Sequence, residues 1–289
     1  MNKLILLVVF LMVTVLGQAQ TGSEIYLFDL SSKKGSISLS NPVNATNHPG
    51  YDNQPFFHTD KPILYYASFN EEGRSDIKSY DYSNGKTISI TQTNEREYSP
   101  TLTPDKKYLS CIIQRDNGEQ NLGKYPVNGG EAILLIDNLT VGYHGWLDDD
   151  WVLMFILGDP MTLHLYNVKT KEDKIITENI GRSIHRIPKE DAMSFVHKQS
   201  ASEWQIKKFD NKTESISVII TTLSGREDLA WTPDGTIIMS DGSKLFQYKL
   251  GKSKTWEEIA TTFPKEVKGI TRLAVSADGK KLALVVSEE

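Results

Sequence analysis

The stretch that decides the fold is YSPTLTPDKKYLSCIIQ, residues 98–114. In it an extended segment ends on Leu102, Asp105 follows three positions later in a turn, and an apolar run continues beyond. The same pairing of an apolar or aromatic residue with an acid occurs six times: Phe57/Asp60, Leu102/Asp105, Trp146/Asp149, Ile187/Glu190, Trp231/Asp234 and Val275/Asp278. The acids lie 45, 44, 41, 44 and 44 residues apart. A fixed period of this size is typical of proteins built from stacked repeats.

One repeat, residues 98–139, reads as four short strands. The predicted strands are Ser99–Thr103, Tyr108–Gln114, Asn121–Val127 and Glu131–Ile136. Residues that favour turns separate them, including Asp, Asn and Gly in the runs at 116–118 and 128–130. Short strands joined in this way predict an antiparallel meander. The acid of the first turn is expected to accept a hydrogen bond from its own backbone two residues on.

A second series of residues confirms the period. The third strand of each repeat carries an aromatic residue shortly before its hairpin: Phe28, Tyr80, Tyr125, Tyr166, Phe209 and Tyr248. Because each sheet of a stacked array must bury its face against the next, we expect these rings to pack between neighbouring sheets rather than to bind a ligand.

The two series are out of phase, which predicts how the array closes. The repeat pattern begins on a third and a fourth strand, at Glu24–Leu30 and Ser36–Asn41. It finishes on a first and a second strand, at Arg272–Ser276 and Lys281–Ser287. Closure into a ring would remove exposed sheet edges. We therefore predict an all-β fold, a six-bladed β-propeller of four-stranded antiparallel blades, with five contiguous blades and one composite blade from both termini.

Three segments resemble the repeat of a known family. They are GRSDIKSYDYSNGK at 73–86, YSPTLTPDKKYL at 98–109 and SADGKKLA at 276–283. They are similar to the strand-and-hairpin signature of TolB-like six-bladed propellers, whose repeats follow the pattern SPxWSPDGKxIAF. The resemblance extends from about residue 23 to the end and implies the same fold. Such propellers serve as scaffolds, binding modules and enzyme appendages, so the resemblance does not imply one activity.

The first residues have the features of an export signal. A basic start at Lys3 precedes an apolar run of 13 residues, Leu4–Leu16, and the small residues Gly17 and Ala19 follow. The run is too short to span a bilayer by itself. We predict a signal peptide at 1–19, a single propeller domain at 20–289 with no transmembrane segment in the mature chain, and a periplasmic or extracellular location.

The charge of the chain argues against nucleic acid as a partner. The net charge is −5 and the basic residues are scattered, whereas nucleic-acid binding requires a basic face. We therefore expect no nucleic-acid partner. Cys111 is the only cysteine, which excludes an internal disulfide, and we expect it to be a small buried core residue.

The candidate site is the mouth of the central channel, where loops lead into the innermost strand of each blade. Loops held by a rigid scaffold commonly carry function. The ligand-binding candidates are Asp52, Glu97, Tyr143, His144, Arg182, His185, Arg226, Asp228 and Arg272. His144 and His185 occupy equivalent places in adjacent repeats, two residues before the apolar anchor. They could hold a metal or act in acid–base chemistry, or they could be histidines hydrogen-bonded to backbone between blades.

We predict an exported, non-enzymatic module that binds a protein, peptide or glycan at the channel mouth. We expect no cofactor, no metal and a monomer. The alternative is a propeller enzyme acting on carbohydrate, a lyase or glycoside hydrolase, using His144, His185 or the Asp52/Glu97 carboxylates. Carboxylates about 5 to 10 Å apart across the mouth would favour the enzyme. A mouth filled by Tyr and Arg side chains would favour the binding module.

Overall fold

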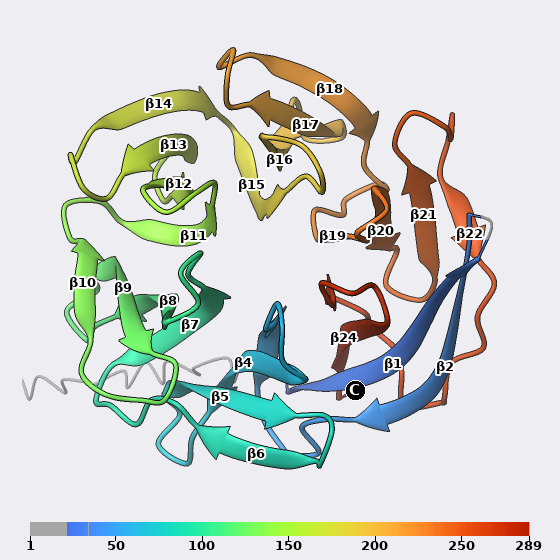
Figure 1. The fold of residues 1–289 in the computed structure, drawn as a ribbon, viewed down its shortest axis with the longest axis horizontal. Helices are drawn as coiled ribbons and strands as arrows, with labels where there is room; N and C mark the ends of the chain where they lie inside the picture. Colours follow the sequence, from blue (N-terminus) through green and yellow to red (C-terminus); the bar gives the residue numbers. More distant parts are fainter. Residues whose placement is uncertain (1–21, 34, 289) are drawn as a thin grey trace, which may run out of the picture.

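The computed structural model describes residues 22–33 and 35–288 and shows a ring of six sheets around a central axis (Figure 1). Every sheet has four antiparallel strands, so the predicted all-β, six-bladed propeller is confirmed. The predicted signal peptide at 1–19 lies outside the described residues. In the part of the chain that is described, no helix is long and apolar enough to cross a membrane.

Five blades are contiguous in sequence, and each runs from the channel outward. Blade 1 is β3(Asp52–Phe57), β4(Ile63–Phe69), β5(Ser75–Asp81) and β6(Lys86–Ser89). Blade 2 is β7(Arg96–Leu102), β8(Tyr108–Gln114), β9(Gln120–Pro126) and β10(Ile133–Ile136). Blade 3 is β11(Val141–Trp146), β12(Trp151–Ile156), β13(Thr162–Asn167) and β14(Asp173–Glu178). Blade 4 is β15(Ile180–Arg186), β16(Ala192–Lys198), β17(Trp204–Asp210) and β18(Ile216–Thr221). Blade 5 is β19(Leu229–Trp231), β20(Thr236–Ser240), β21(Leu245–Lys249) and β22(Glu257–Ile259).

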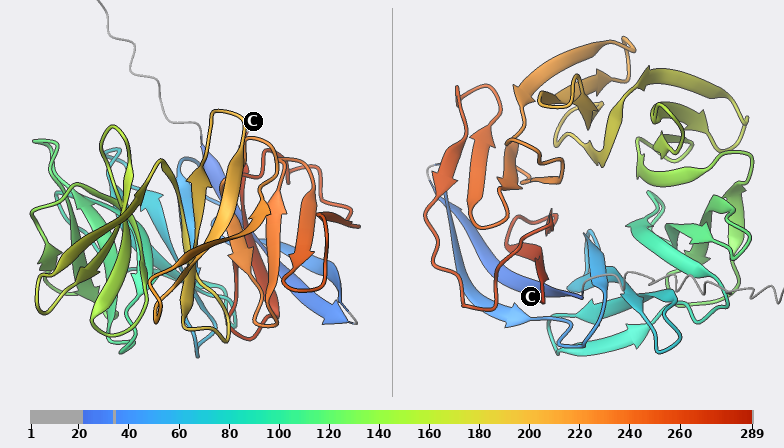
Figure 2. Two further views of the ribbon diagram at one scale, coloured as in Figure 1. Left: turned by 90° about the horizontal axis from the view of Figure 1, so that it is seen from above. Right: turned by 180° about the vertical axis from the view of Figure 1, so that it is seen from behind.

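The sixth blade is composite, as predicted. Its strands from the channel outward are β23(Arg272–Val275), β24(Lys281–Ser287), β1(Ser23–Lys33) and β2(Ser36–Asn44). β1 pairs with β24 in unbroken register from Ser23↔Ser287 to Asp29↔Lys281. Lys281 also forms an ion pair with Asp29, which lowers the pKa of that carboxyl. Figure 2 shows the ring from the side and from behind, with the blades evenly arranged about the axis.

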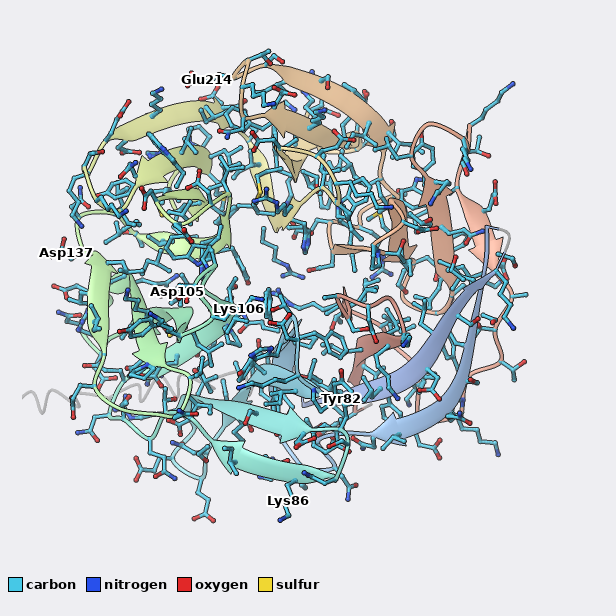
Figure 3. All side chains as sticks on the ribbon, viewed as in Figure 1. Tyr82, Lys86, Asp105, Lys106, Asp137 and Glu214 are labelled. Atoms are coloured by element: carbon cyan, nitrogen blue, oxygen red, sulfur yellow. The ribbon has the colours of Figure 1, made fainter. Side chains whose placement is uncertain are left out.

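Two of the recurring acids, Asp105 and Asp278, stabilise the turn between the first and second strand through a backbone hydrogen bond. Asp105 Oδ1 accepts a hydrogen bond from the Lys107 backbone N–H at 3.0 Å and from Thr103 Oγ1 at 2.6 Å. Asp278 accepts the equivalent bonds from Lys280 and Ser276. The expected bond two residues on is therefore confirmed for Asp105 and Asp278. Figure 3 places Asp105 and Lys106 near the axis, whereas Lys86, Asp137 and Glu214 lie at the outer rim.

The aromatic residues of the third strands pack between blades. Phe209 is fully buried in a cluster with Leu153 of the preceding blade, and Tyr125 lies in a cluster with Tyr65 and Ala67 of blade 1. The core thus consists of six apolar clusters, each formed largely between two adjacent sheets. Cys111 is buried in one of them, as expected.

Candidate functional site

A pocket of about 430 Å³ lies in the channel and is lined by the innermost strands of all six blades. Its walls include Gln54, Ser99, Tyr143, Leu229 and Leu273. A second pocket of about 550 Å³ shares Phe56, His185 and Leu273 with the first and continues toward the turns that carry the recurring acids. The two pockets together make a channel whose walls are largely prolines, aromatic rings and aliphatic side chains.

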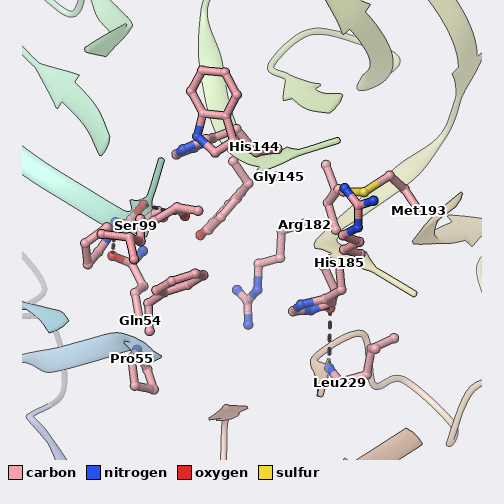
Figure 4. A pocket seen from close by; sticks show the side chains of 18 of the residues that line it. Gln54, Pro55, Ser99, His144, Gly145, Arg182, His185, Met193 and Leu229 are labelled. Atoms are coloured by element: carbon pink, nitrogen blue, oxygen red, sulfur yellow. Dashed lines mark hydrogen bonds between the residues drawn. The ribbon is translucent and has the colours of Figure 1, made fainter. Parts of the chain in front are cut away.

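Arg182 and Asp228 form the centre of a charged cluster at the mouth. Arg182 lies near the start of β15, and its Nη2 is 2.6 Å from Asp228 Oδ2. Figure 4 shows the Arg182 side chain reaching toward the middle of the pocket, with Gln54 and Ser99 on one side and His185 and Leu229 on the other. The two nearby carboxylates, Asp228 and Glu227, raise the pKa of Arg182 even though burial opposes that shift.

Arg272 joins two opposite blades across the channel. It begins β23 in the composite blade, and its Nη2 donates to the Tyr143 hydroxyl of β11 in blade 3 at 2.8 Å. Its Nη1 lies 3.8 Å from Asp228 Oδ1, beyond hydrogen-bonding distance. Tyr143 is itself held by an edge contact with Phe155, with ring centroids 5.8 Å apart. The mouth is thus filled by arginine and tyrosine side chains.

Glu227 completes the cluster on its outer side. Its Oε2 accepts the backbone N–H of Arg182 at 3.0 Å and lies 3.2 Å from Lys198 Nζ. Sequence reasoning missed Lys198, because it lies at the end of a second strand, β16, rather than in a loop at the mouth. Its only sequence signal is a basic residue at the end of that strand.

His144 is buried between blades 2 and 3. Ser110 Oγ donates to the Thr101 carbonyl at 3.0 Å and accepts from Trp146 Nε1 at 2.8 Å. His144 Nε2, 2.7 Å from the same Oγ, must then donate to the remaining lone pair, so the ring hydrogen is assigned to Nε2. Burial lowers the pKa of His144 to about 3.

His185 has a different partner, although it occupies the equivalent place in blade 4. Its Nε2 lies 2.8 Å from Ser183 Oγ, which also accepts the Leu229 backbone N–H at 3.3 Å. Burial lowers the pKa of His185 to about 4, against the opposing charge of Asp228. Both histidines are therefore neutral at pH 7, and Nε2 of each ring bonds to a serine hydroxyl rather than to backbone.

Asp52 and Glu97 are buried inside the blades and do not line the channel pocket. Glu97 is fully buried and accepts hydrogen bonds from Thr91, Thr93 and Tyr125. Burial raises its pKa. Asp52 is 1% exposed, and burial raises its pKa to about 6, against the opposing charge of His48. The structure therefore places these two carboxylates apart from Arg182, Asp228 and Arg272.

Arg226 does not line the channel pocket but borders a smaller pocket beside it, together with Arg182, Glu227 and Asp228. Its Nη2 donates to the backbone carbonyl of Asp241, in the loop between β20 and β21.

The described side chains do not form a metal centre. Among the described residues, no group of three or more His, Cys, Asp and Glu side chains is placed to hold a metal ion. Asp148 Oδ1, in the acidic run at 148–150, accepts the backbone N–H groups of Asp150 and Trp151 and so stabilises its own turn.

Solved structures with a similar fold include TolB proteins and an oligogalacturonate lyase. The chain is similar to a putative TolB from Agrobacterium tumefaciens, with a TM-score of 0.69, 15% identity, and coverage of 93% of this chain and 99% of that one. It is also similar to TolB from Acinetobacter baumannii, with a TM-score of 0.57, 16% identity, and coverage of 93% of this chain and 64% of that one. An oligogalacturonate lyase in complex with manganese matches with a TM-score of 0.60, 14% identity, and coverage of 94% and 99%.

No protein-family model matches the sequence, and no curated protein matches it. The structural likeness defines the class: the fold is that of a TolB-like six-bladed β-propeller. At these identities the likeness concerns the fold alone.

Proposed function

We propose that this protein is an exported, non-enzymatic binding module that takes a protein, peptide or glycan at the mouth of its channel. Residues 1–19 would serve as the signal peptide, and the mature protein would act as a monomer in the periplasm or outside the cell. The observation that carries the proposal is the filling of the mouth by Arg182, Arg272 and Tyr143 around one carboxylate, Asp228. Such groups supply oriented hydrogen bonds around an apolar pocket, as binding sites do.

The chemistry of the remaining candidates supports binding over catalysis. A general acid or base works best when its pKa lies near the operating pH. Burial holds His144 and His185 well below that range, and both are already bonded to serines. Asp52 and Glu97, the carboxylate pair of the enzymatic alternative, are enclosed within blades 1 and 2. These side chains are poorly placed to transfer protons to a ligand in the channel.

The carbohydrate enzyme remains the second candidate, because oligogalacturonate lyases share the fold. A second one, from Vibrio parahaemolyticus, matches with a TM-score of 0.59, 16% identity, and coverage of 87% of this chain and 83% of that one. Its test is direct: purified protein is incubated with oligogalacturonate, with and without Mn²⁺. Product formation that is lost in the Arg272→Gln variant would establish the enzyme and overturn the binding module.

Binding is tested by panning the protein against a random heptapeptide library and a glycan array. Thr101 lines the pocket, and Thr101→Trp would place an indole in the channel. Ile88→Trp is the matched control, because Ile88 is 60% exposed on the outermost strand of blade 1. We expect ligands that bind the wild type and Ile88→Trp but not Thr101→Trp. Ligands that bind all three proteins equally would place the binding surface elsewhere.

A further inference from the structure

The charged cluster at the mouth has an excess of positive charge. Arg182, Lys198 and Arg272 carry three positive charges, and Glu227 and Asp228 carry two negative ones. Each acid already has a close basic partner: Lys198 Nζ lies 3.2 Å from Glu227, and Arg182 Nη2 lies 2.6 Å from Asp228. The remaining cation, Arg272, stands 3.8 Å from the already paired Asp228.

Arg272 is nevertheless largely removed from water. Its side chain is 15% exposed, and Asp228 beside it is 17% exposed. Among the described residues, the one hydrogen bond that Arg272 is seen to donate is to the neutral Tyr143 hydroxyl. A guanidinium has five N–H donors in a planar fork that matches a carboxylate. A buried charge with so few hydrogen-bond partners is energetically costly unless a group of opposite charge pairs with it.

The position of Arg272 is fixed before any ligand arrives. The guanidinium carbon lies 5.2 Å from the centre of the Tyr143 ring while Nη2 donates to the Tyr143 hydroxyl. Tyr143 in turn packs against Phe155. A side chain held in this way loses little further freedom on binding, which favours affinity.

Apolar surface lies next to the arginines in the same pocket. Phe56, Leu102 and Leu273 line it, together with Pro55 and Pro100. Prolines and aliphatic side chains suit an apolar peptide side chain. Polar side chains, among them Gln54, Ser99 and Thr101, line other parts of the same pocket.

We infer that the channel mouth binds an acidic peptide, with an Asp, Glu or C-terminal carboxylate on the free donors of Arg272 and an adjacent apolar side chain in the pocket below. This inference rests on the proposed function and names its ligand class. Binding would bring the cluster to charge neutrality and form a charge-assisted, forked pair, the stronger kind of hydrogen bond. Because Arg182 is already paired with Asp228, the ligand carboxylate binds to Arg272.

The test uses fluorescein-labelled peptides recovered from the heptapeptide library, measured by fluorescence anisotropy on the full chain. We expect recovered sequences to carry Asp or Glu beside an apolar residue. Changing that acid to its amide should weaken binding about tenfold or more, the loss expected for one charged hydrogen-bond pair. Arg272→Gln should produce a similar loss, and Arg272→Lys a partial one, because lysine keeps the charge without the fork.

The matched control is Arg74→Gln, because Arg74 pairs with Asp116 and lines neither channel pocket nor the smaller pocket beside the cluster. It should leave affinity unchanged, and circular dichroism melting shows whether each variant is folded. Peptides that bind in the channel without an acid, and equally well to Arg272→Gln, would overturn this inference while leaving the binding module intact. Binding of trigalacturonate but of no peptide would overturn it in favour of an acidic glycan. Binding that Thr101→Trp does not weaken would overturn both proposals.

Discussion

At the residue scale, the Asp52 carboxyl is almost completely buried at the start of β3. Both of its carboxylate oxygens are buried, and the Ser68 hydroxyl is the neighbour that most favours the ionised form. A second neighbour is the imidazole of His48, whose Nδ1 lies 3.9 Å away and whose side chain is about half exposed. Burial therefore raises the pKa of Asp52 to about 6, from an ordinary value of 3.8. The Asp52 proton is therefore retained to higher pH in the folded protein than in the unfolded one.

This raised pKa gives a pH dependence with a definite sign. Between pH 4 and 6 the folded state binds the Asp52 proton more tightly than the unfolded state, so this group's contribution to stability falls as pH rises through that window. We expect Asp52→Asn to be more stable than the wild type at pH 8, by about 3 kcal/mol, with the difference shrinking toward pH 4. Urea unfolding at several pH values measures it.

Asp60→Asn is the control for this prediction. Asp60 is exposed, and its ion pair with Lys106 lowers its pKa, so it stabilises the fold above pH 4 and this contribution is lost on acidification. Its substitution should shift the pH profile weakly and in the opposite direction. An Asp52→Asn profile parallel to that of the wild type would show that the buried carboxylate does not have a raised pKa.

At the scale of elements, the same tryptophan–serine hydrogen bond occurs at two of the boundaries between blades. A tryptophan at the end of a first strand donates to a serine on the second strand of the preceding blade: Trp146 to Ser110 at 2.8 Å, and Trp231 to Ser194 at 2.9 Å. Each serine in turn donates to a first-strand carbonyl of its own blade. Ser110 differs because it also serves His144. This arrangement ties three strands of two blades together.

Removing each serine should therefore have different costs. Ser194→Ala leaves the Trp231 N–H without an acceptor, and we expect a loss of about 1–3 kcal/mol in the free energy of unfolding. Ser110→Ala leaves both the Trp146 and the His144 N–H without an acceptor and should lower the free energy of unfolding further. Denaturant unfolding of the two variants in parallel gives the comparison. Equal losses would mean that the His144 bond contributes nothing, and that our assignment of its ring hydrogen is wrong.

The elements also show how far the sequence could be read. The turn bonds of Asp105, Asp234 and Asp278 and the packing of the third-strand aromatics between sheets recur with the blades, so the period of the two series predicted the blades and the composite closure. The burial of Asp52 and Glu97 was not predictable in this way. Gln54 and Ser99 have φ of 57° and 54°, and the strand register shifts around both. Such bulges reorient the side chains that precede them, which periodicity alone does not reveal.

At the scale of the whole molecule, the ring geometry creates the site. Tyr143 and Arg272 are 129 residues apart and meet only because their blades face each other across the channel. The same geometry brings the described ends of the chain together, since the Glu288 N–H donates to the Gly22 carbonyl at 3.1 Å. No local motif encodes either contact, which is why the sequence yielded the candidates but not their pairing.

Ring closure can be tested by circular permutation. The ends are joined by a short glycine linker, and the chain is reopened either between blades, at Asp137/Asn138, or inside a blade, at Gly130/Glu131, where the residues are exposed in both cases. The second permutant keeps one blade built from both ends, and we expect a denaturation midpoint close to that of the wild type. The first loses this interlock and should unfold faster and at lower denaturant. Equal behaviour would mean that the composite blade does not secure the ring.

The most direct measurement of the central claim is a crystal structure of the protein with a peptide recovered from the library. We predict density in the channel mouth, with a peptide carboxylate about 2.7–2.9 Å from a guanidinium nitrogen of Arg272 and an apolar side chain against Phe56 and Leu273. A peptide bound along the outer strands β6 or β18, with the mouth unchanged, would contradict the account.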